Sequence, residues 1–133
     1  HRATSNICSN ETLIALMGAM HMSLLGPEGI EKLALRVAAS TELTKRSVCA
    51  IRGVELLNSN NQNFRDFTVK LPGDAADAVA HMDDLGVLGG LALGDWWDSM
   101  SDCLLIGCDE RTSQSDIDSL VSSLTSWIEE VQA

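Results

Sequence analysis

The first ten residues place several polar side chains directly ahead of an apolar helical pattern that begins near Glu11. The polar side chains of this loop that could contact a bound group are those of Arg2, Thr4, Ser5, Asn6 and Cys8. Backbone N–H groups at a helix N-terminus, together with the helix dipole, favour anions, so the loop could present donors to a carboxylate or a phosphate. Alternatively, Ser5 and Asn6 bond only to nearby backbone and satisfy the loop and the helix cap.

The cysteines and histidines show no metal-ligand spacing. Cys8, Cys49, Cys103 and Cys108 contain no CxxC pair, and no histidine is suitably spaced from them or from another histidine. A chain of 133 residues does not need disulfide staples to fold. We therefore expect free, buried thiols and no metal site.

Residues 86–94 form a glycine-rich stretch that invites comparison with phosphate-binding loops. The stretch matches neither GxGxxG nor GxxxxGK[ST], and no lysine follows it, so backbone turns explain its glycines better. Trp96 and Trp97 come next, within a run of acidic residues that lacks the register of a calcium loop. Two adjacent indoles cannot both face a core easily, so we expect at least one of them at an interface.

Helical periodicity and breaker residues predict how the first half of the chain positions these groups. The pattern predicts a mostly buried helix from Glu11, ended by Leu25-Gly26-Pro27, and a second helix from Glu28 to about Ala50. Residues 54–57 and 64–71 then read as an antiparallel hairpin around an Asn-rich turn.

The second half of the chain alternates helices with one strand. Asp74 is expected to cap a helix over residues 75–85, with His81 near its end as a surface residue. The expected apolar face of this helix is formed by Ala78, Val79, Met82 and Leu85. The apolar run 103–108 predicts a central strand buried on both faces. A last helix follows, capped by Thr112 or Ser113. This order predicts a two-layer α/β or α+β domain.

Composition excludes several function classes. The formal net charge of −10 argues against nucleic acid and anionic membranes as partners. No apolar run reaches the roughly 20 residues of a membrane span, and no secretion signal is visible, so we expect a single cytoplasmic domain and no membrane contact. The chain opens at His1 without a methionine, which suggests part of a longer protein.

Several stretches together resemble a known family, the glycine cleavage system P-protein, in the form of its subunit 1. The matching stretches, in the family's order, are RATSNICSN at 2–10, LLGPEG at 24–29, GVLGGLALG at 86–94, Leu104-Leu105-Ile106, Arg111-Thr112 and Ile117-Asp118. The resemblance covers nearly the whole chain. One departure is Asp109-Glu110, where relatives tend to have Thr-Glu, which removes any role of that hydroxyl.

The resemblance implies a fold and a domain arrangement. It implies an α+β, two-layer domain with a small, mainly antiparallel sheet and helices on one face, similar to the C-terminal small domain of type I pyridoxal-phosphate (PLP) enzymes. Residues 1–133 would then form a single domain of a longer subunit, with residues 1–26 linking it to a large domain that precedes it.

A PLP enzyme needs a lysine that holds the cofactor as a Schiff base. Lys32 and Lys45 stand on a charged helix face and Lys70 stands on a strand, so none lies in a glycine- or serine-rich cofactor loop. We therefore expect this chain alone to be inactive and to bind no cofactor. The resemblance implies the same, because subunit 1 lacks this lysine and subunit 2 carries it.

The resemblance also implies partners and a reaction. The complex is a glycine dehydrogenase (decarboxylating), an oxidoreductase of amino-acid catabolism that decarboxylates glycine with PLP and passes the aminomethyl group to the lipoyl arm of the H-protein. The expected partners are subunit 2, lipoylated H-protein and glycine. The channel or interface candidates are Arg2, Thr4, Ser5, Asn6, Cys8, Trp96 and Trp97.

Two alternatives remain open on the sequence. The chain could be an interaction or regulatory domain that shares the fold and has no role in glycine cleavage. It could also be part of an active type I enzyme whose lysine lies ahead of His1. A cofactor lysine in that preceding sequence would favour the second alternative.

Overall fold

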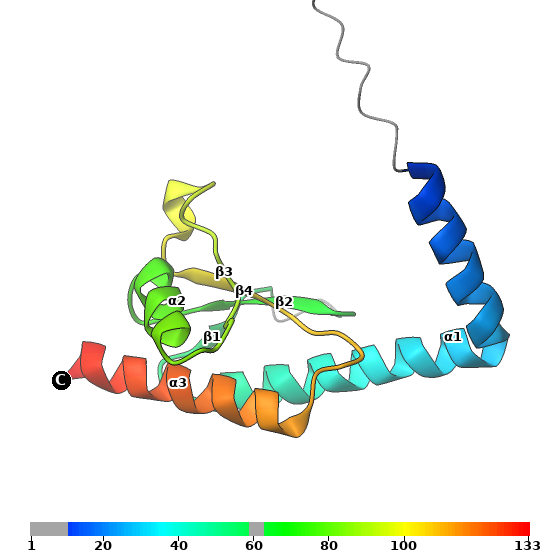
Figure 1. Ribbon diagram of the computed structural model, residues 1–133. Coiled ribbons are helices and arrows are strands. Elements are labelled where there is room, and N and C mark those ends of the chain that lie inside the picture. The colour runs from blue at the N-terminus through cyan, green and yellow to red at the C-terminus, as the bar shows by residue number, and fades with distance from the viewer. Residues whose placement is uncertain (1–10, 59–62) are drawn as a thin grey trace, which may run out of the picture. The chain divides into compact units, whose positions relative to one another are not determined.

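The computed structural model describes residues 11–58 and 63–133, and these residues divide into two compact units (Figure 1). The first unit comprises residues up to Leu35 and the second runs from Arg36 to Ala133. The helix α1 (Glu11–Cys49) contributes to both units, so each unit is described by itself.

The first unit is the N-terminal part of α1, and Gly26 interrupts it. Gly26 has φ 63° and ψ 179°, a conformation outside the helical region that glycine adopts without steric cost. The helix resumes at once, because the fixed φ of Pro27 suits the first turn of a helix. The break predicted at Leu25-Gly26-Pro27 is therefore confirmed.

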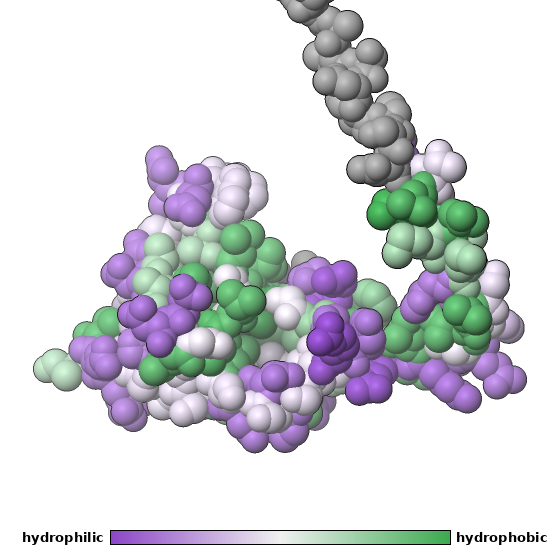
Figure 2. Space-filling view, in the orientation of Figure 1, coloured by the Kyte–Doolittle hydropathy of each residue, from purple (hydrophilic) through white to green (hydrophobic). Residues whose placement is uncertain are grey.

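The predicted burial of this first helical segment is wrong for the chain as the structure describes it. Leu13, Met20 and Leu24 are 58%, 59% and 86% exposed. Figure 2 shows apolar side chains, in green, gathered on this part of the helix. An apolar stripe predicts that a helix packs against other apolar atoms, but it does not identify which part of the polypeptide supplies those atoms.

The expectation about membrane spans also needs correction. A window of 18 residues within α1 has a mean hydropathy of 1.3 and none of it is buried, so length and composition alone would let this helix cross a bilayer. Gly, Ser and His interrupt every run of apolar residues in this helix, but they do not bring the mean hydropathy of the 18-residue window below that of a membrane span. Interior helices of larger proteins have the same composition, so this property does not by itself indicate a membrane.

The second unit contains a four-stranded sheet. Its strands are β1 (Glu55–Leu56), β2 (Asp66–Lys70), β3 (Leu91–Ala92) and β4 (Cys103–Gly107), in the order β1-β2-β4-β3 (Figure 1). Every neighbouring pair is antiparallel, which confirms the predicted hairpin and the mainly antiparallel sheet.

The central position of β4 is confirmed, and β3 is a strand that the pattern did not predict. Strand β4 lies between β2 and β3, with Ile106 opposite Phe67 and Leu105 opposite Leu91. Strand β3 has two residues and directly follows Gly89-Gly90, so it is too short to show an alternating pattern.

Helices α2 (Ala75–Asp84) and α3 (Gln114–Gln132), with the end of α1, pack on one face of the sheet (Figure 1). Along β2, Phe67 and Val69 are buried while Asp66 and Lys70 are exposed, as expected when one face is covered. The core on that face includes Val48, Phe67, Val69, Ala78, Met82, Leu104, Ile106, Leu120, Leu124, Trp127 and Ile128. The predicted α+β fold is confirmed.

Both predicted helix caps in this unit are confirmed. The side chain of Asp74 accepts a hydrogen bond from the Ala76 backbone N–H at 2.8 Å. Ser113, rather than Thr112, caps α3 and forms a reciprocal capping box with Asp116. These caps determine where α2 and α3 begin.

A short 3₁₀ helix (Asp98–Met100) lies between β3 and β4, after the tryptophan pair. The thiols of Cys103 and Cys108 are free and buried, as predicted, whereas that of Cys49 is free but only half-buried. Cys8 lies outside the described residues.

Candidate functional site

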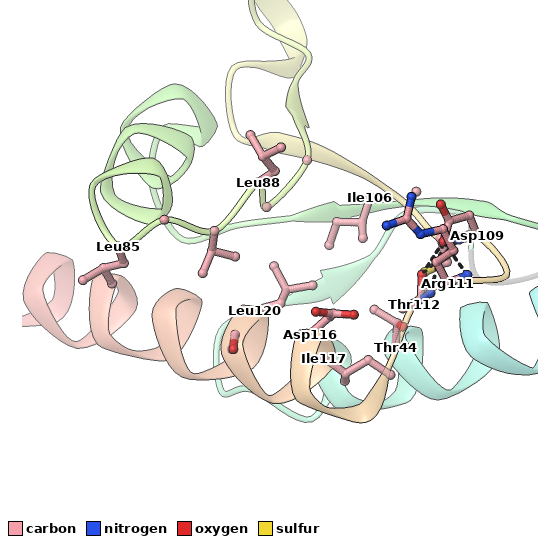
Figure 3. Close-up of a pocket in the computed structure, with 17 residues that line it drawn as sticks. Thr44, Leu85, Leu88, Ile106, Asp109, Arg111, Thr112, Asp116, Ile117 and Leu120 are labelled. Carbon is pink, nitrogen blue, oxygen red and sulfur yellow. Dashed lines mark hydrogen bonds between the residues drawn. The ribbon is translucent and has the colours of Figure 1, made fainter.

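A pocket of about 590 Å³ lies beside the start of α3 in the second unit (Figure 3). Its walls come from the connection between α2 and β3, the end of β4, the following turn, and the first turns of α3. Thr44, from the second half of α1, also lines it. The volume lies within the range of small-molecule sites in proteins, about 300–1,000 Å³.

The floor of the pocket is apolar and its rim is exposed. Ile106, Ile117 and Leu120 are buried core residues that line the floor. On the rim, Leu85 and Leu88 are 58% and 95% exposed. The predicted apolar face of the helix over 75–85 included Leu85, and this part of that prediction is wrong, because Leu85 caps the C-terminus of α2 and lies beyond its packed face.

Gly89 and Gly90 form part of the wall, and steric contacts explain why glycine stands there. A Cβ at Gly89 would clash with the Met82 sulfur, and one at Gly90 would lie 2.5 Å from the Leu105 carbonyl oxygen. Gly90 also has φ 141°, in the region that favours glycine. These contacts agree with the expectation that backbone turns, rather than phosphate binding, explain the glycines.

The turn after β4 is organised by the Asp109 carboxylate. Its Oδ1 accepts hydrogen bonds from the backbone N–H groups of Arg111 at 2.8 Å and Thr112 at 3.0 Å. The Thr112 hydroxyl in turn accepts from the Asp109 backbone N–H at 3.0 Å. The Asp109 side chain therefore supplies the acceptor that closes this turn.

The capping box holds a second carboxylate of the pocket in a fixed position. Asp116 Oδ2 accepts from the Ser113 hydroxyl at 2.7 Å and from the Ser113 backbone N–H at 2.8 Å. These two hydrogen bonds lower the pKa of Asp116 below its usual 3.8. The charge of Asp116 is thus used to stabilise the start of α3.

Arg111 supplies the positive charge of the pocket. Figure 3 shows its side chain extending from the turn toward the pocket. Among residues 11–58 and 63–133, no carboxylate lies within ion-pair distance of its guanidinium. The pocket therefore combines an apolar floor with one guanidinium and the carboxylates of Asp109 and Asp116, so it offers charges of both signs to a bound group. The arrangement is suited to binding and offers no lysine for covalent chemistry.

Of the predicted site residues, Trp96 and Trp97 belong to the described part of the chain. They lie in the loop after β3 and are 57% and 56% exposed, and their place at an interface stays a prediction. Neither lines the pocket. The remaining candidates, Arg2, Thr4, Ser5, Asn6 and Cys8, lie outside the described residues.

Two arrangements were not found from the sequence. The first is the closure of the turn at Asp109-Glu110-Arg111 by hydrogen bonds between Asp109 and Thr112, for which the Asp-x-x-Thr spacing was a usable signal. The second is a contact between α2 and α3, in which His81 Nε2 lies 2.8 Å from the Ser126 hydroxyl. His81 is half-buried by α3, so the expectation of a plain surface histidine is wrong. Residues far apart in the sequence carry no local signal for such a contact.

Comparisons with known proteins assign this chain to one protein family. The family described as glycine cleavage system P-protein matches residues 1–124. The protein named probable glycine dehydrogenase (decarboxylating) subunit 1 of Geotalea daltonii is 38% identical over 124 residues, which are 93% of this chain and 28% of that protein.

Solved structures agree with this match. A glycine decarboxylase (P-protein) of the glycine cleavage system, solved in inhibitor-bound form, superposes with a TM-score of 0.78 at 26% identity and covers 93% of this chain and 28% of that one. A NifS-like protein from Rickettsia africae superposes at 0.61 over 77% of this chain and 31% of that one; at 12% identity, this likeness shows the fold alone. The chain therefore spans little more than a quarter of the relatives it matches, and it belongs to the glycine cleavage system P-protein family.

Proposed function

We propose that this chain is the C-terminal small domain of the non-catalytic subunit of glycine decarboxylase, subunit 1 of the P-protein. The observation that carries this proposal is the family match over residues 1–124, which reaches the pocket turn and most of α3. The relatives' printed name, glycine dehydrogenase (decarboxylating) subunit 1, supports the choice of subunit.

The lysines support a non-catalytic role. The only lysines of the chain are Lys32, Lys45 and Lys70. Each faces a carboxylate on its own or a neighbouring element: Lys32 lies 3.9 Å from Glu28, Lys70 lies 3.1 Å from Asp102, and Lys45 pairs with Glu42. None of the three lines the pocket.

The state of Lys70 is also the opposite of what Schiff-base chemistry requires. Its hydrogen bond to Asp102 raises the pKa of the Lys70 ammonium, so the amine stays protonated at neutral pH. A lysine that attacks a carbonyl must be neutral, which usually requires a lowered pKa. The residues of this chain therefore do not fit attachment of PLP, and the proposal places the cofactor on subunit 2.

In the proposed complex, the two subunits decarboxylate glycine with PLP and transfer the aminomethyl group to the lipoyl arm of H-protein in the cytoplasm. This chain would stabilise the heteromer. Its polar N-terminal residues, among them Ser5 and Asn6, would line the channel to the reaction centre, as the order of loop and helix suggests.

The test of the proposal is glycine-dependent exchange of labelled bicarbonate. The full-length form of this subunit is assayed alone, and then with the PLP-bearing subunit and lipoylated H-protein. Activity in the mixture only is the expected result. Activity of this subunit alone would overturn the non-catalytic role, and an inactive mixture with a partner that is competent with its own subunit 1 would overturn the assignment to glycine cleavage.

The channel role has its own test in the full-length subunit. Asn6→Ala is expected to lower glycine turnover of the reconstituted complex more than it lowers the melting temperature of the subunit. Asn61→Ala, in the Asn-rich stretch of sequence between β1 and β2, is the matched control and should leave turnover unchanged. Normal turnover with Asn6→Ala would refute the channel role and leave the subunit assignment intact.

A second candidate function is an interaction domain outside glycine cleavage. Exposed large apolar side chains favour it, since Leu88 is 95% exposed and Trp96 and Trp97 are more than half exposed. Aromatic residues of this kind are enriched at protein interfaces. An inactive reconstituted mixture is the result that would select this function.

A further inference from the structure

The first part of α1 is uncharged around its whole circumference. No Asp, Glu, Lys or Arg stands between Glu11 and Glu28. Bulky apolar residues recur at three- and four-residue steps, and His21 with the small residues Thr, Ala, Gly and Ser fills the other positions up to Leu25. Seven of the eight large ones are more than half exposed here, and only Leu25 is half-buried; the seven are Leu13, Ile14, Leu16, Met17, Met20, Met22 and Leu24.

A helix with no polar face is stable only where its surroundings cover it on every side. A soluble surface helix carries a charged face, as the next turns of α1 do with Glu31, Lys32 and Arg36. Residues 12–25 therefore require either a bilayer or the interior of a larger protein.

The apolar window of 18 residues in α1 includes Gly26, which leaves the helical region, so the uninterrupted apolar helix is shorter than that window, and this favours a protein interior. Gly26 leaves the helical region at one end and Glu11 stands at the other. A straight helix over residues 12–25 is roughly 21 Å long at about 1.5 Å per residue, whereas the hydrocarbon core of a bilayer is roughly 30 Å thick. The charged flanks also lack the cluster of Lys and Arg that anchors a helix at a membrane surface.

The comparisons with known proteins indicate that this interior is that of a P-protein subunit. The family match begins at residue 1, so this helix belongs to the P-protein pattern. This chain covers 28% of the Geotalea daltonii relative and 28% of the solved P-protein, so most of the polypeptide in these relatives lies outside the region described here.

We propose that residues 12–25 form an interior helix of the P-protein subunit, covered on all sides by the larger part of the same polypeptide that the relatives carry beyond this region. The inference rests on the proposed function only in treating the chain as part of that subunit. The helix then connects the second unit to the body of the subunit through buried packing rather than through a flexible tether.

Three methionines within the segment provide a direct test by oxidative footprinting. Met17, Met20 and Met22 are exposed in this chain, whereas Met82 is fully buried and serves as the internal reference. Methionine converts to the sulfoxide when oxidant reaches its sulfur. The experiment compares oxidation by dilute hydrogen peroxide, followed by mass spectrometry, in the 133-residue chain and in the full-length subunit.

The expected result is that oxidation of the three methionines is slower by more than about tenfold in the full-length subunit, approaching the rate of Met82. Equal rates in the two proteins would overturn the proposal. Protection that appears only as protein concentration rises, with a dimer seen by light scattering, would assign the helix to a second copy. Protection that appears only with phosphatidylcholine–phosphatidylglycerol vesicles would assign it to a membrane.

A pair of variants in the full-length subunit gives an independent readout. Leu24 is 86% exposed and Leu43, on the second half of the same helix, is 45% exposed. Exposure in this chain alone would make Leu24→Asp the milder change. The proposal expects the reverse, with a larger fall in melting temperature for Leu24→Asp than for Leu43→Asp, and the opposite order would overturn it.

Neither experiment needs glycine, PLP, H-protein or the partner subunit. Failure of the footprinting test therefore refutes the interior helix, and failure of the bicarbonate exchange test refutes the proposed catalytic context. If Leu24→Asp prevents folding altogether, the footprinting of the unmodified subunit still decides the question.

Discussion

Replacement of Gly90 by alanine should destabilise the second unit strongly, because two costs coincide at this residue. The φ of 141° belongs to a region that is essentially restricted to glycine, and side chains there cost on the order of 1–3 kcal/mol. The new Cβ would also lie 2.5 Å from the Leu105 carbonyl oxygen. That oxygen is backbone in β4, so it cannot move without disturbing the pairing of Leu105 with Leu91.

Gly86→Ala is the matched control in the same connection. Gly86 has φ 74° and open space where its Cβ would stand, so only the left-handed backbone cost of about 1–2 kcal/mol applies. For Gly90→Ala we expect a loss of about 3 kcal/mol or more, against a total of roughly 5–15 kcal/mol for a typical domain.

The assay is urea unfolding followed by tryptophan fluorescence, since Trp127 is 4% exposed in the core and reports loss of packing. The midpoint should fall markedly further for Gly90→Ala than for Gly86→Ala, with similar slopes. Equal midpoints for the two variants would refute the steric argument and, with it, the explanation of the glycine-rich wall of the pocket.

The other predictions concern the α3 cap and the lysines. Ser113→Ala should lower the free energy of unfolding by about 1 kcal/mol in the same assay, because it removes the N-cap. Because the pKa of Asp116 is lowered in the folded state, its stabilising effect is present above pH 4 and is lost as pH falls through the folded pKa; Asp116→Asn should flatten the stability curve in that acidic range. Lys70→Met should leave bicarbonate exchange by the reconstituted complex unchanged, and a large loss would contradict the placement of PLP on subunit 2.

Local chemistry explains why much of the second unit could be predicted. Ser113 and Asp116 stand at capping-box spacing, and Ile117, Leu120 and Leu124 repeat with the helical period, so the start and buried face of α3 are visible within one short stretch. The break at Gly26 is equally local.

Contacts between distant residues explain what could not be predicted. Strand β3 exists because Leu91 and Ala92 find partners on β4, since two residues have no periodicity of their own. The approach of His81 to Ser126 depends on the packing of α2 against α3. Neither contact leaves a signal in the neighbouring sequence.

The pocket also combines features that local sequence explains with features that depend on contacts between distant residues. Each wall has a local cause, such as the Asp109 turn that presents Arg111. Their meeting around one hollow of about 590 Å³ follows only from the order of strands and helices in space.

The sequence by itself determined the helices, their caps, the central strand and the resemblance to the P-protein family, because each depends on the type and spacing of nearby residues. Only the tertiary structure decided which predicted faces are covered. The stripe that contains Leu120 is buried against the sheet, whereas the equally apolar stripe that contains Met20 is exposed in this chain. The spacing of apolar residues predicts which face of a helix should be buried. Whether that face is buried depends on whether other apolar atoms pack against it.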